Sequence, residues 1–258
     1  MLPEILGYRP LPLLLAIAIV VGWVPALRAA HRDGFSGVRV VLYLLALGLI
    51  AVVGAKVYSV LERGPFVPLS DEFRTGFRYP GGLFALVVGA PVLCFMLPVG
   101  LPVRRPLDYM APGIAFSLAI TRVDCLLAGC CAGAVCSYPW CIRFPRFSPV
   151  WNRHFDERWI EGGFAQSLAV HPLQIYFLIA SLAAGWILLR VERHKTFEGQ
   201  IILLFLALHE GAKYLLEFFR DPPEATIQSF SLGLACAGVI GLLVGMRVSR
   251  SRPSPAAA

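Results

Sequence analysis

Six ionisable side chains lie inside long apolar stretches of this sequence, where a charge is costly unless it finds a partner or a water-filled cavity. They are Lys56, Arg122, Asp124, Glu210, Lys213 and Glu217. Such groups must face a protein interior, which makes them candidates for a functional site. Structural ion pairing, such as Arg122 with Asp124 or Glu217, is the alternative.

The last three of these side chains continue into a regular stripe. The stripe consists of Glu210, Lys213, Glu217 and Arg220, at intervals of three, four and three residues. At 3.6 residues per turn they share one face of a helix, which Asp221-Pro222-Pro223 is expected to end. Two cations of this stripe, with Arg122, fit an anionic phosphate ligand, because arginine offers a fork and lysine a point charge.

Long apolar stretches are the elements that must position these groups. Of the 258 residues, 57% are hydrophobic and only 15% are charged, against about 25% charged in soluble domains. This composition excludes a disordered chain, a secreted disulfide mini-protein and a cytosolic enzyme. Seven stretches approach the ~20 residues that cross a bilayer as a helix: Leu11–Leu27, Val40–Leu61, Gly81–Leu101, Ala111–Leu127, Leu173–Leu189, Gln200–Phe219 and Phe230–Met246. We therefore predict an all-α membrane protein with about seven transmembrane helices, forming a single integral membrane domain over residues 1–258.

Basic residues predict the orientation. With the N-terminus outside and the C-terminus inside, the inner loops carry 11 Lys and Arg residues and the outer segments nine, as the positive-inside rule requires. Residues 134–171, between spans four and five, are too polar to span and are predicted to form a small head on the outer face. Their Trp and Arg residues suit the headgroup layer, and an ordinary solvated loop is the alternative.

Glycines and cysteines crowd the region before this head. Gly81 and Gly82, and later Gly129 and Gly133, would let a backbone approach a ligand closely, although glycine is also common in helix packing. Five of the seven cysteines lie between Cys125 and Cys141. They lack the paired C-x-x-C spacing of zinc sites, so no metal is predicted. A disulfide such as Cys136–Cys141, or small apolar packing, remains open.

Taken together, the motifs resemble the bacterial prolipoprotein diacylglyceryl transferase family, in a divergent branch with a Gly-Cys-Cys signature. The resemblance rests on Tyr79-Pro-Gly-Gly-Leu83, on Arg122-Val-Asp-Cys-Leu-Leu-Ala-Gly-Cys-Cys-Ala-Gly133, on Pro139-Trp140 with Phe144-Pro145, on His171-Pro-Leu-Gln-Ile-Tyr176 and on Lys213-Tyr-Leu-Leu-Glu-Phe-Phe-Arg220. It covers essentially the whole chain.

The resemblance implies a seven-span inner-membrane enzyme with a periplasmic head and a periplasmic N-terminus. Such enzymes transfer diacylglyceryl from phosphatidylglycerol to the lipobox cysteine thiol of a preprolipoprotein, which leaves a thioether and glycerol phosphate. The implied partners are phosphatidylglycerol, the client's signal peptide and membrane lipid; no cofactor, metal or nucleic acid is expected.

The resemblance also implies roles for individual residues. Arg122, Lys213 and Glu217 are the predicted catalytic residues, with the two cations stabilising the leaving phosphate. The predicted substrate-binding residues are Arg122, Arg220, Gly81, Gly82, Gly129, Gly133, His171, Gln174 and Tyr176. The candidates for accepting the thiol proton are Asp124, Glu210, Glu217, His209 and Tyr79, with Glu217 slightly favoured.

Three positions depart from the family pattern. Pro80 stands where the family has histidine, Cys125 where it has asparagine, and the tyrosine of the first span has no clear match near residues 10–15. Lys213 stands in place of an arginine, which keeps the charge and loses the fork. A relative that binds anionic phospholipid or signal peptide without transfer is therefore the second hypothesis. A transporter is the third, although no repeat supports it.

Overall fold

The computed structural model describes residues 11–63, 79–96, 104–163 and 165–251. Within these residues it is helical, with no β-structure beyond three isolated bridges. The chain divides into two compact units, residues 25–110 and residues 1–24 with 111–258. The chain passes from one unit to the other within two helices, α1 (Leu11–Arg32) and α5 (Arg104–Ala128). Each passage lies at or beside a proline, Pro25 in α1 and Pro112 in α5. Proline removes a backbone hydrogen bond, so a helix bends most readily there.

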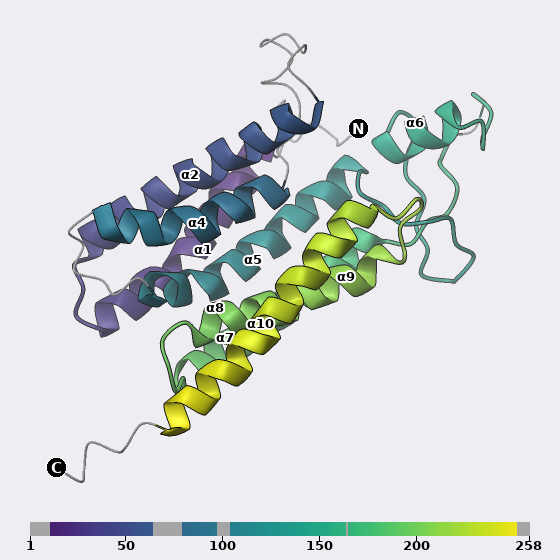
Figure 1. Ribbon diagram of the computed structural model, residues 1–258. Helices are drawn as coiled ribbons and strands as arrows, with labels where there is room; N and C mark the ends of the chain where they lie inside the picture. Colours follow the sequence, from purple (N-terminus) through teal and green to yellow (C-terminus); the bar gives the residue numbers. More distant parts are fainter. Residues whose placement is uncertain (1–10, 64–78, 97–103, 164, 252–258) are drawn as a thin grey trace, which may run out of the picture. The chain divides into compact units, whose positions relative to one another are not determined.

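Two helices packed side by side dominate the unit of residues 25–110 (Figure 1). They are α2 (Gly37–Arg63) and α4 (Tyr79–Met96). Small residues make their close approach feasible: a Cβ on Gly81 would lie 2.5 Å from the carbonyl oxygen of Gly54, and a Cβ on Gly54 would lie 2.7 Å from the carbonyl oxygen of Gly81. Glycine at both positions thus brings the two backbones together, as in membrane helix pairs.

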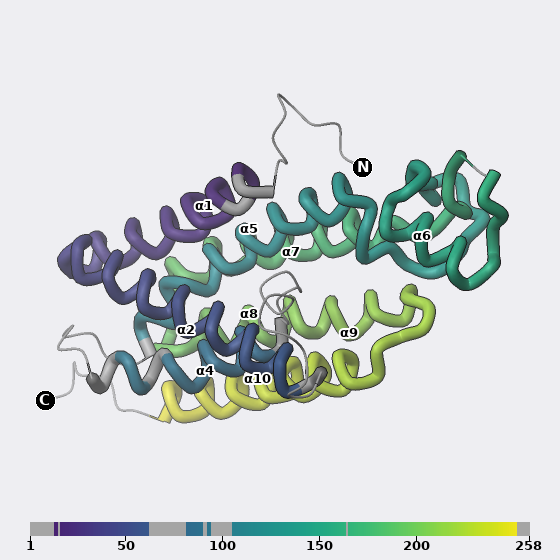
Figure 2. Tube along the Cα trace, turned by 90° about the horizontal axis from the view of Figure 1, so that it is seen from above, coloured from purple at the N-terminus to yellow at the C-terminus, as the bar shows by residue number. Residues whose placement is uncertain are grey.

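The other unit holds the first part of α1 and the helices that follow α4 in the chain. The latter are the second part of α5, the short α6 (Pro149–Asp156), α7 (Leu173–Glu192), α8 (Gln200–Phe205), a π-helix (Leu206–Glu210), α9 (Gly211–Glu217) and α10 (Ala225–Ser251). The α8 to α9 segment runs continuously beside α10 (Figure 2). Gly238 permits this contact, because a Cβ there would lie 2.7 Å from backbone atoms of Ala207 and Leu203.

A hydrophobic core joins α5, α7, α8 and the start of the π-helix within this unit. Its buried members are Ala111, Ala115, Leu188, Ile201, Phe205 and Leu206. The alanines of α5 lie four residues apart and so share one face, onto which the larger side chains of the other helices pack. Burying an aliphatic side chain of this size stabilises the fold by about 1.5–3 kcal/mol.

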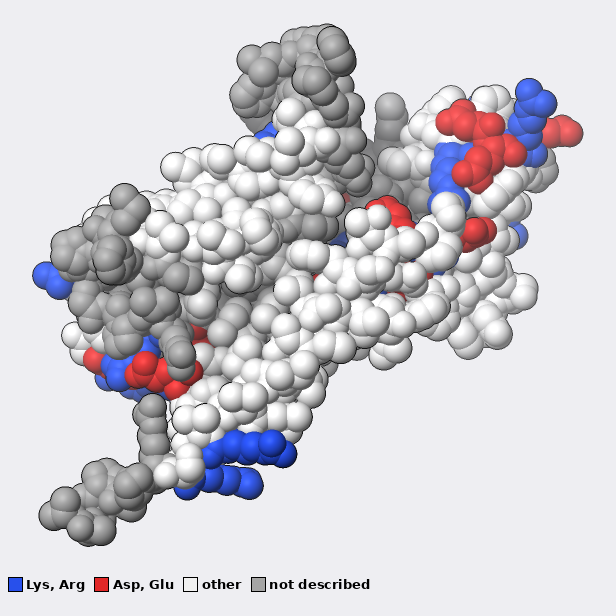
Figure 3. All heavy atoms as spheres, viewed as in Figure 1, with Lys and Arg blue, Asp and Glu red and all other residues white. Residues whose placement is uncertain are grey.

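Among the described residues, four helices are long and apolar enough to cross a membrane: Gly37–Leu61, Arg105–Ala128, Leu173–Glu192 and Ala225–Ser251. The outer surface of α10 is correspondingly apolar, with Val239, Ile240 and Leu243 about half exposed. Basic side chains gather near its C-terminal end, whereas the middle of the helix is uncharged (Figure 3). The prediction of an all-helical membrane protein is therefore confirmed. All seven predicted stretches overlap helices, although residues 97–101 of the third lie outside the described residues.

Residues 134–171 form a small folded segment rather than an open loop. A disulfide joins Cys136 to Cys141, with the Cα atoms 6.2 Å apart, as the sequence allowed. Isolated antiparallel bridges tie Val135 and Ile142 to Val170, and Val170 is buried with Phe144 and Val150 in a local core.

Candidate functional site

After the end of α5 the chain reverses direction and hydrogen-bonds to the last turn of that helix. The backbone N–H of Gly129 donates to the carbonyl of Leu126 (3.2 Å), and that of Cys130 donates to the carbonyl of Cys125 (3.1 Å). With Gly129 at φ +66°, this is a Schellman motif, which glycine favours because it enters the left-handed region without strain. The motif brings Cys130 back beside Cys125, and the Cys130 thiol lies 3.7 Å from the Cys125 carbonyl oxygen.

Three segments meet at Gly133. Its N–H donates to the carbonyl of His171 (2.9 Å), while the next N–H, of Ala134, donates to the carbonyl of Phe219 (2.7 Å). A Cβ at Gly133 would lie 2.6 Å from the Phe219 oxygen and 2.8 Å from the His171 Cβ. Only glycine fits where the loop after α5, the start of α7 and the end of α9 converge.

Side chains at the start of α7 hold this junction. Gln174 is buried and its side-chain amide donates to the carbonyl of Cys130. The Nδ1 atom of His171 lies 3.2 Å from the Tyr176 hydroxyl, and both rings pack edge-on against Phe219. His171, Gln174 and Tyr176 thus position the backbone of the junction.

A network of one arginine and two carboxylates lies at the C-terminal end of α9. The Arg220 Nε lies 3.0 Å from Oε1 of Glu217, whose side chain is only 1% exposed. The same guanidinium reaches Glu224 at 3.4 Å, and that carboxylate is 45% exposed. Arg220 therefore has one buried partner that fixes it and one solvent-facing partner that an anion could replace.

The predicted stripe is interrupted by the π-helix, which adds a residue to one helical turn just before Gly211. His209, Glu210 and Lys213 are all buried next to this wide turn, a feature frequent at functional sites. On α5, the Arg122 guanidinium lies 4.5 Å from the centre of the Phe177 ring of α7. A cation–π contact of this kind holds a guanidinium without a neutralising carboxylate.

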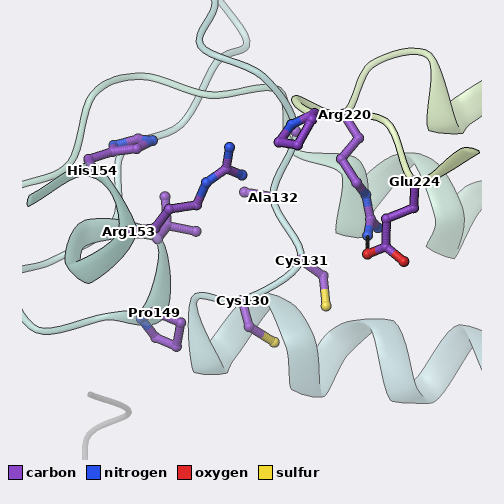
Figure 4. A pocket seen from close by; sticks show the side chains of 11 residues that line it. Cys130, Cys131, Ala132, Pro149, Arg153, His154, Arg220 and Glu224 are labelled. Atoms are coloured by element: carbon purple, nitrogen blue, oxygen red, sulfur yellow. Dashed lines mark hydrogen bonds and ion pairs between the residues drawn. The ribbon is translucent and has the colours of Figure 1, made fainter. Parts of the chain in front are cut away.

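A cavity of about 320 Å³ opens beside the Gly133 junction. It is lined by Cys130, Cys131, Ala132, Gly133, Pro149, Val150, Arg153, His154, Arg220, Pro222 and Glu224. In Figure 4, Cys130 and Cys131 reach it from the loop after α5, Arg153 and His154 from α6, and Arg220 from the other side. The two guanidinium groups give this cavity a positively charged lining that suits an anionic ligand.

The local charges perturb two groups at this cavity. Hydrogen bonds from Cys125 and Cys130, with the positive charges of Arg122 and Arg220, lower the pKa of the Cys131 thiol. Burial and the charge of Arg153 lower the pKa of His154. The imidazole is therefore neutral near pH 7, and its Nδ1 accepts the Leu168 N–H at 3.2 Å.

Comparison with known proteins identifies the family. The family model described as prolipoprotein diacylglyceryl transferase matches residues 8–248. The chain belongs to the prolipoprotein diacylglyceryl transferase family. The family predicted from the motifs is therefore confirmed.

Relatives named phosphatidylglycerol–prolipoprotein diacylglyceryl transferase are distant but similar along most of their length. The Geobacter sulfurreducens protein is 25% identical, over 97% of this chain and 94% of its own. The Finegoldia magna protein is 24% identical, over 88% and 87%. A second such transferase of Clostridium perfringens is 22% identical, over 83% and 79%. These matches support the predicted transferase and give no better support to a relative that only binds lipid.

The structure gathers most of the predicted site residues in one unit. Gly129, Gly133, His171, Gln174, Glu217 and Arg220 lie in or next to the junction, Tyr176 packs against it, and Arg122 and Lys213 lie on the adjoining helices α5 and α9. Gly81 and Gly82 instead lie buried in the α2–α4 contact of the other unit. Glu217 pairs with Arg220, whereas the sequence had offered Arg122 as its partner.

Sequence reasoning missed His154 and Glu224. His154 lies one turn after Val150 on α6, so its burial follows from the amphipathic spacing of that short helix. Glu224 lies four residues after Arg220, a spacing typical of an ion pair. Neither residue is in a quoted motif, and so neither was singled out.

Proposed function

We propose that this protein transfers diacylglyceryl from phosphatidylglycerol to the lipobox cysteine thiol of a preprolipoprotein. The observation that carries the proposal is the family match over residues 8–248, which leaves only short ends of the chain unmatched. The products would be a thioether on the client and glycerol phosphate.

The proposed setting is a bacterial inner membrane crossed seven times, with the N-terminus and the 134–171 head on the periplasmic side. The distribution of Lys and Arg supports this orientation. The Cys136–Cys141 disulfide is in keeping with an oxidising compartment for the head. Exposed Tyr138, Trp140 and Trp159 give that head the amphipathic rings typical of a membrane interface.

The cations of the site would bind and stabilise the phosphate. Arg122 is held by the face of the Phe177 ring, so its N–H donors stay available for the phosphate oxygens. Lys213 is buried at 6% exposure and would add a point charge. Their charge would stabilise the leaving glycerol phosphate most strongly as it develops in the transition state.

Arg220 would hold the headgroup through the donor that now reaches Glu224. The exposed Glu224 pair is weak and replaceable, because surface ion pairs contribute about 0–1 kcal/mol. Glu217, which the sequence favours as a proton acceptor, makes the contact expected of a residue that orients Arg220. We therefore assign it a positioning role. Gly81 and Gly82 are proposed to support substrate binding without touching the substrate, by allowing α2 and α4 to pack together.

Complementation of a transferase-depleted bacterium tests the proposal. The full chain is expressed, and mass spectrometry reads diacylglyceryl on a reporter lipoprotein. Arg122→Ala is expected to reduce modification at least about 100-fold, the effect of losing one transition-state donor. Arg190→Ala is the matched control, because Arg190 makes the same contact with Trp186, also 4.5 Å from the ring centre, near the other end of α7.

Modification by the wild type and by Arg190→Ala, with its loss in Arg122→Ala, supports the proposal. A membrane-inserted wild-type chain that modifies neither the reporter nor lipoproteins from its own source would refute transfer. A lipid- or signal-peptide-binding relative would then be the better description.

A further inference from the structure

Three thiols to which the transfer reaction assigns no role are gathered beside the cavity. The Sγ atoms of Cys125, Cys130 and Cys131 all lie within 4.8 Å of one another. Each is a free thiol, unlike Cys136 and Cys141 of the neighbouring disulfide. The cluster comes from two features of one short loop. The Schellman motif returns Cys130 to Cys125, and Cys131 follows Cys130 directly with a positive φ of 57°.

This spacing of sulfur atoms suits a soft cation. A zinc ion with Zn–S bonds of ~2.3 Å holds its sulfur ligands about 3.8 Å apart, so the three thiols would need to close by no more than about 1 Å. Three thiolates on a divalent cation carry one net negative charge. Arg122 and Arg220 are near enough to act electrostatically on Cys131, and they would offset that charge.

A tetrahedral cation held by these three sulfur atoms would have a fourth position for a ligand from the cavity. Cys130 and Cys131 line the cavity, whereas Cys125 belongs to the last turn of α5. In Figure 4 the side chains of Cys130 and Cys131 lie between Arg153 on one side and Arg220 on the other. Three protein ligands with an open fourth position are the pattern of catalytic rather than structural zinc.

We propose that Cys125, Cys130 and Cys131 bind a zinc-class divalent cation whose open position receives the client's cysteine thiol. This inference rests on the proposed function and gives it a means of activating the thiol that needs no side-chain base, where Pro80 replaces the family's histidine. The client thiol would release its proton to water on binding the cation and become a thiolate, the nucleophilic form.

The transfer step then balances without another reactant. The thiolate sulfur forms a bond to the glyceryl carbon, the bond from that carbon to the phosphate oxygen breaks, and its electron pair leaves with glycerol phosphate. The product thioether is uncharged and is a weaker ligand than the thiolate, so it can leave the cation.

Metal content of the purified full-length chain tests the site without any transfer assay. Wild type, Cys130→Ser, Cys131→Ser and Cys236→Ser are incubated with zinc under reducing conditions, desalted and measured by inductively coupled plasma mass spectrometry. Cys236, an exposed free thiol on α10, provides the matched control. Titration with cadmium, followed by its thiolate charge-transfer absorption, reports the ligand type and the affinity.

Wild type and Cys236→Ser are expected to retain roughly one equivalent of zinc, and the two cluster variants to bind cadmium more than about 10-fold more weakly. Equal metal in all four chains, or none in a fully reduced wild type, overturns the site. A disulfide among the three cysteines of the chain isolated from membranes, seen as a mass two hydrogens lower than expected, also overturns it.

The two proposals fail in different ways. If the chain binds zinc but modifies no lipoprotein, the metal site stands and the transferase proposal fails. If a zinc-stripped chain transfers diacylglyceryl as fast as the loaded chain, the transferase stands and the role of the metal in activating the thiol is refuted.

Discussion

The buried carboxylate of Glu217 offers the sharpest test of how the site is held together. Its side chain is 1% exposed, and the ion pair to the Arg220 Nε at 3.0 Å is the one salt bridge that it forms among the described residues. Replacing Arg220 by glutamine would break this pair and leave the carboxylate buried, with the charge of Lys213 still acting on it. Breaking a buried pair by removing one partner costs about 3–5 kcal/mol.

Replacing Glu217 by glutamine is expected to lower the unfolding free energy by a smaller amount. In Glu217→Gln the guanidinium keeps Glu224 and remains 20% exposed, so water can solvate it. The amide can still accept a hydrogen bond, and we expect a loss of about 1–3 kcal/mol. The double variant removes both charges, so its cost should fall below the sum of the single costs by about 1–3 kcal/mol.

Equilibrium unfolding by sodium dodecyl sulfate in mixed micelles, followed by far-ultraviolet circular dichroism, measures these free energies. Glu224→Gln is the control, because an exposed partner should contribute no more than about 1 kcal/mol. The reasoning is refuted if Arg220→Gln costs no more than Glu224→Gln, or if the two single costs are additive in the double variant.

Three further predictions concern the junction and the head. Gly133→Ala should lower the unfolding free energy by about 1–3 kcal/mol, since the added methyl group would lie 2.6 Å from a backbone oxygen. Because burial lowers the pKa of His154, the folded head should be most stable above its unfolded pKa of about 6.5 and should lose stability as the pH falls below that value. Protonation would also remove the acceptor of the Leu168 N–H, so hydrogen exchange at Leu168, corrected for intrinsic rates, should speed up in the same range. Replacing Cys136 and Cys141 by alanine opens a loop with a sequence separation of 5 and should cost the head about 2 kcal/mol in unfolding experiments.

Each of these has its own control. Gly163→Ala should be neutral in the same unfolding assay, because nothing lies within 4 Å of a Cβ there, and an equal loss in both variants would contradict the steric argument. The pH effect should vanish in His154→Asn and persist in His194→Asn, which alters an exposed histidine. Reduction of the wild type should reproduce the effect of the double alanine variant; a head indifferent to both changes would mean that the disulfide constrains nothing.

Much of the fold was predictable because its cause is local. Apolar stretches long enough to cross a bilayer produce helices wherever they occur, since a backbone in lipid must satisfy its own hydrogen bonds. The predicted end of the sixth stretch at Asp221-Pro222-Pro223 was nearly right, since α9 ends at Glu217. The π-helix before Gly211 was not predicted, because one extra residue in a turn leaves almost no trace in a periodic pattern.

The candidate site was predictable only in part. A charge inside an apolar stretch is costly in free energy, so its presence indicates a functional site. This reasoning predicts Arg122, Lys213 and Glu217 as site residues. Their partners did not, because partner choice depends on tertiary geometry. Glu217 pairs with Arg220 rather than Arg122, and Arg122 rests on the ring of Phe177. Both contacts involve side-chain directions that spacing alone does not determine.

The thiol cluster shows where a spacing rule fails for a physical reason. The C-x-x-C rule describes two thiols that one tight turn brings to a single cation. Here Gly129 ends a helix, and the resulting motif joins Cys125, the fourth-last residue of α5, to Cys130, the second residue beyond the helix end. A helix end can therefore gather ligands five residues apart, a separation that a search for paired cysteines does not cover. The glycine, rather than the cysteine spacing, was the informative residue.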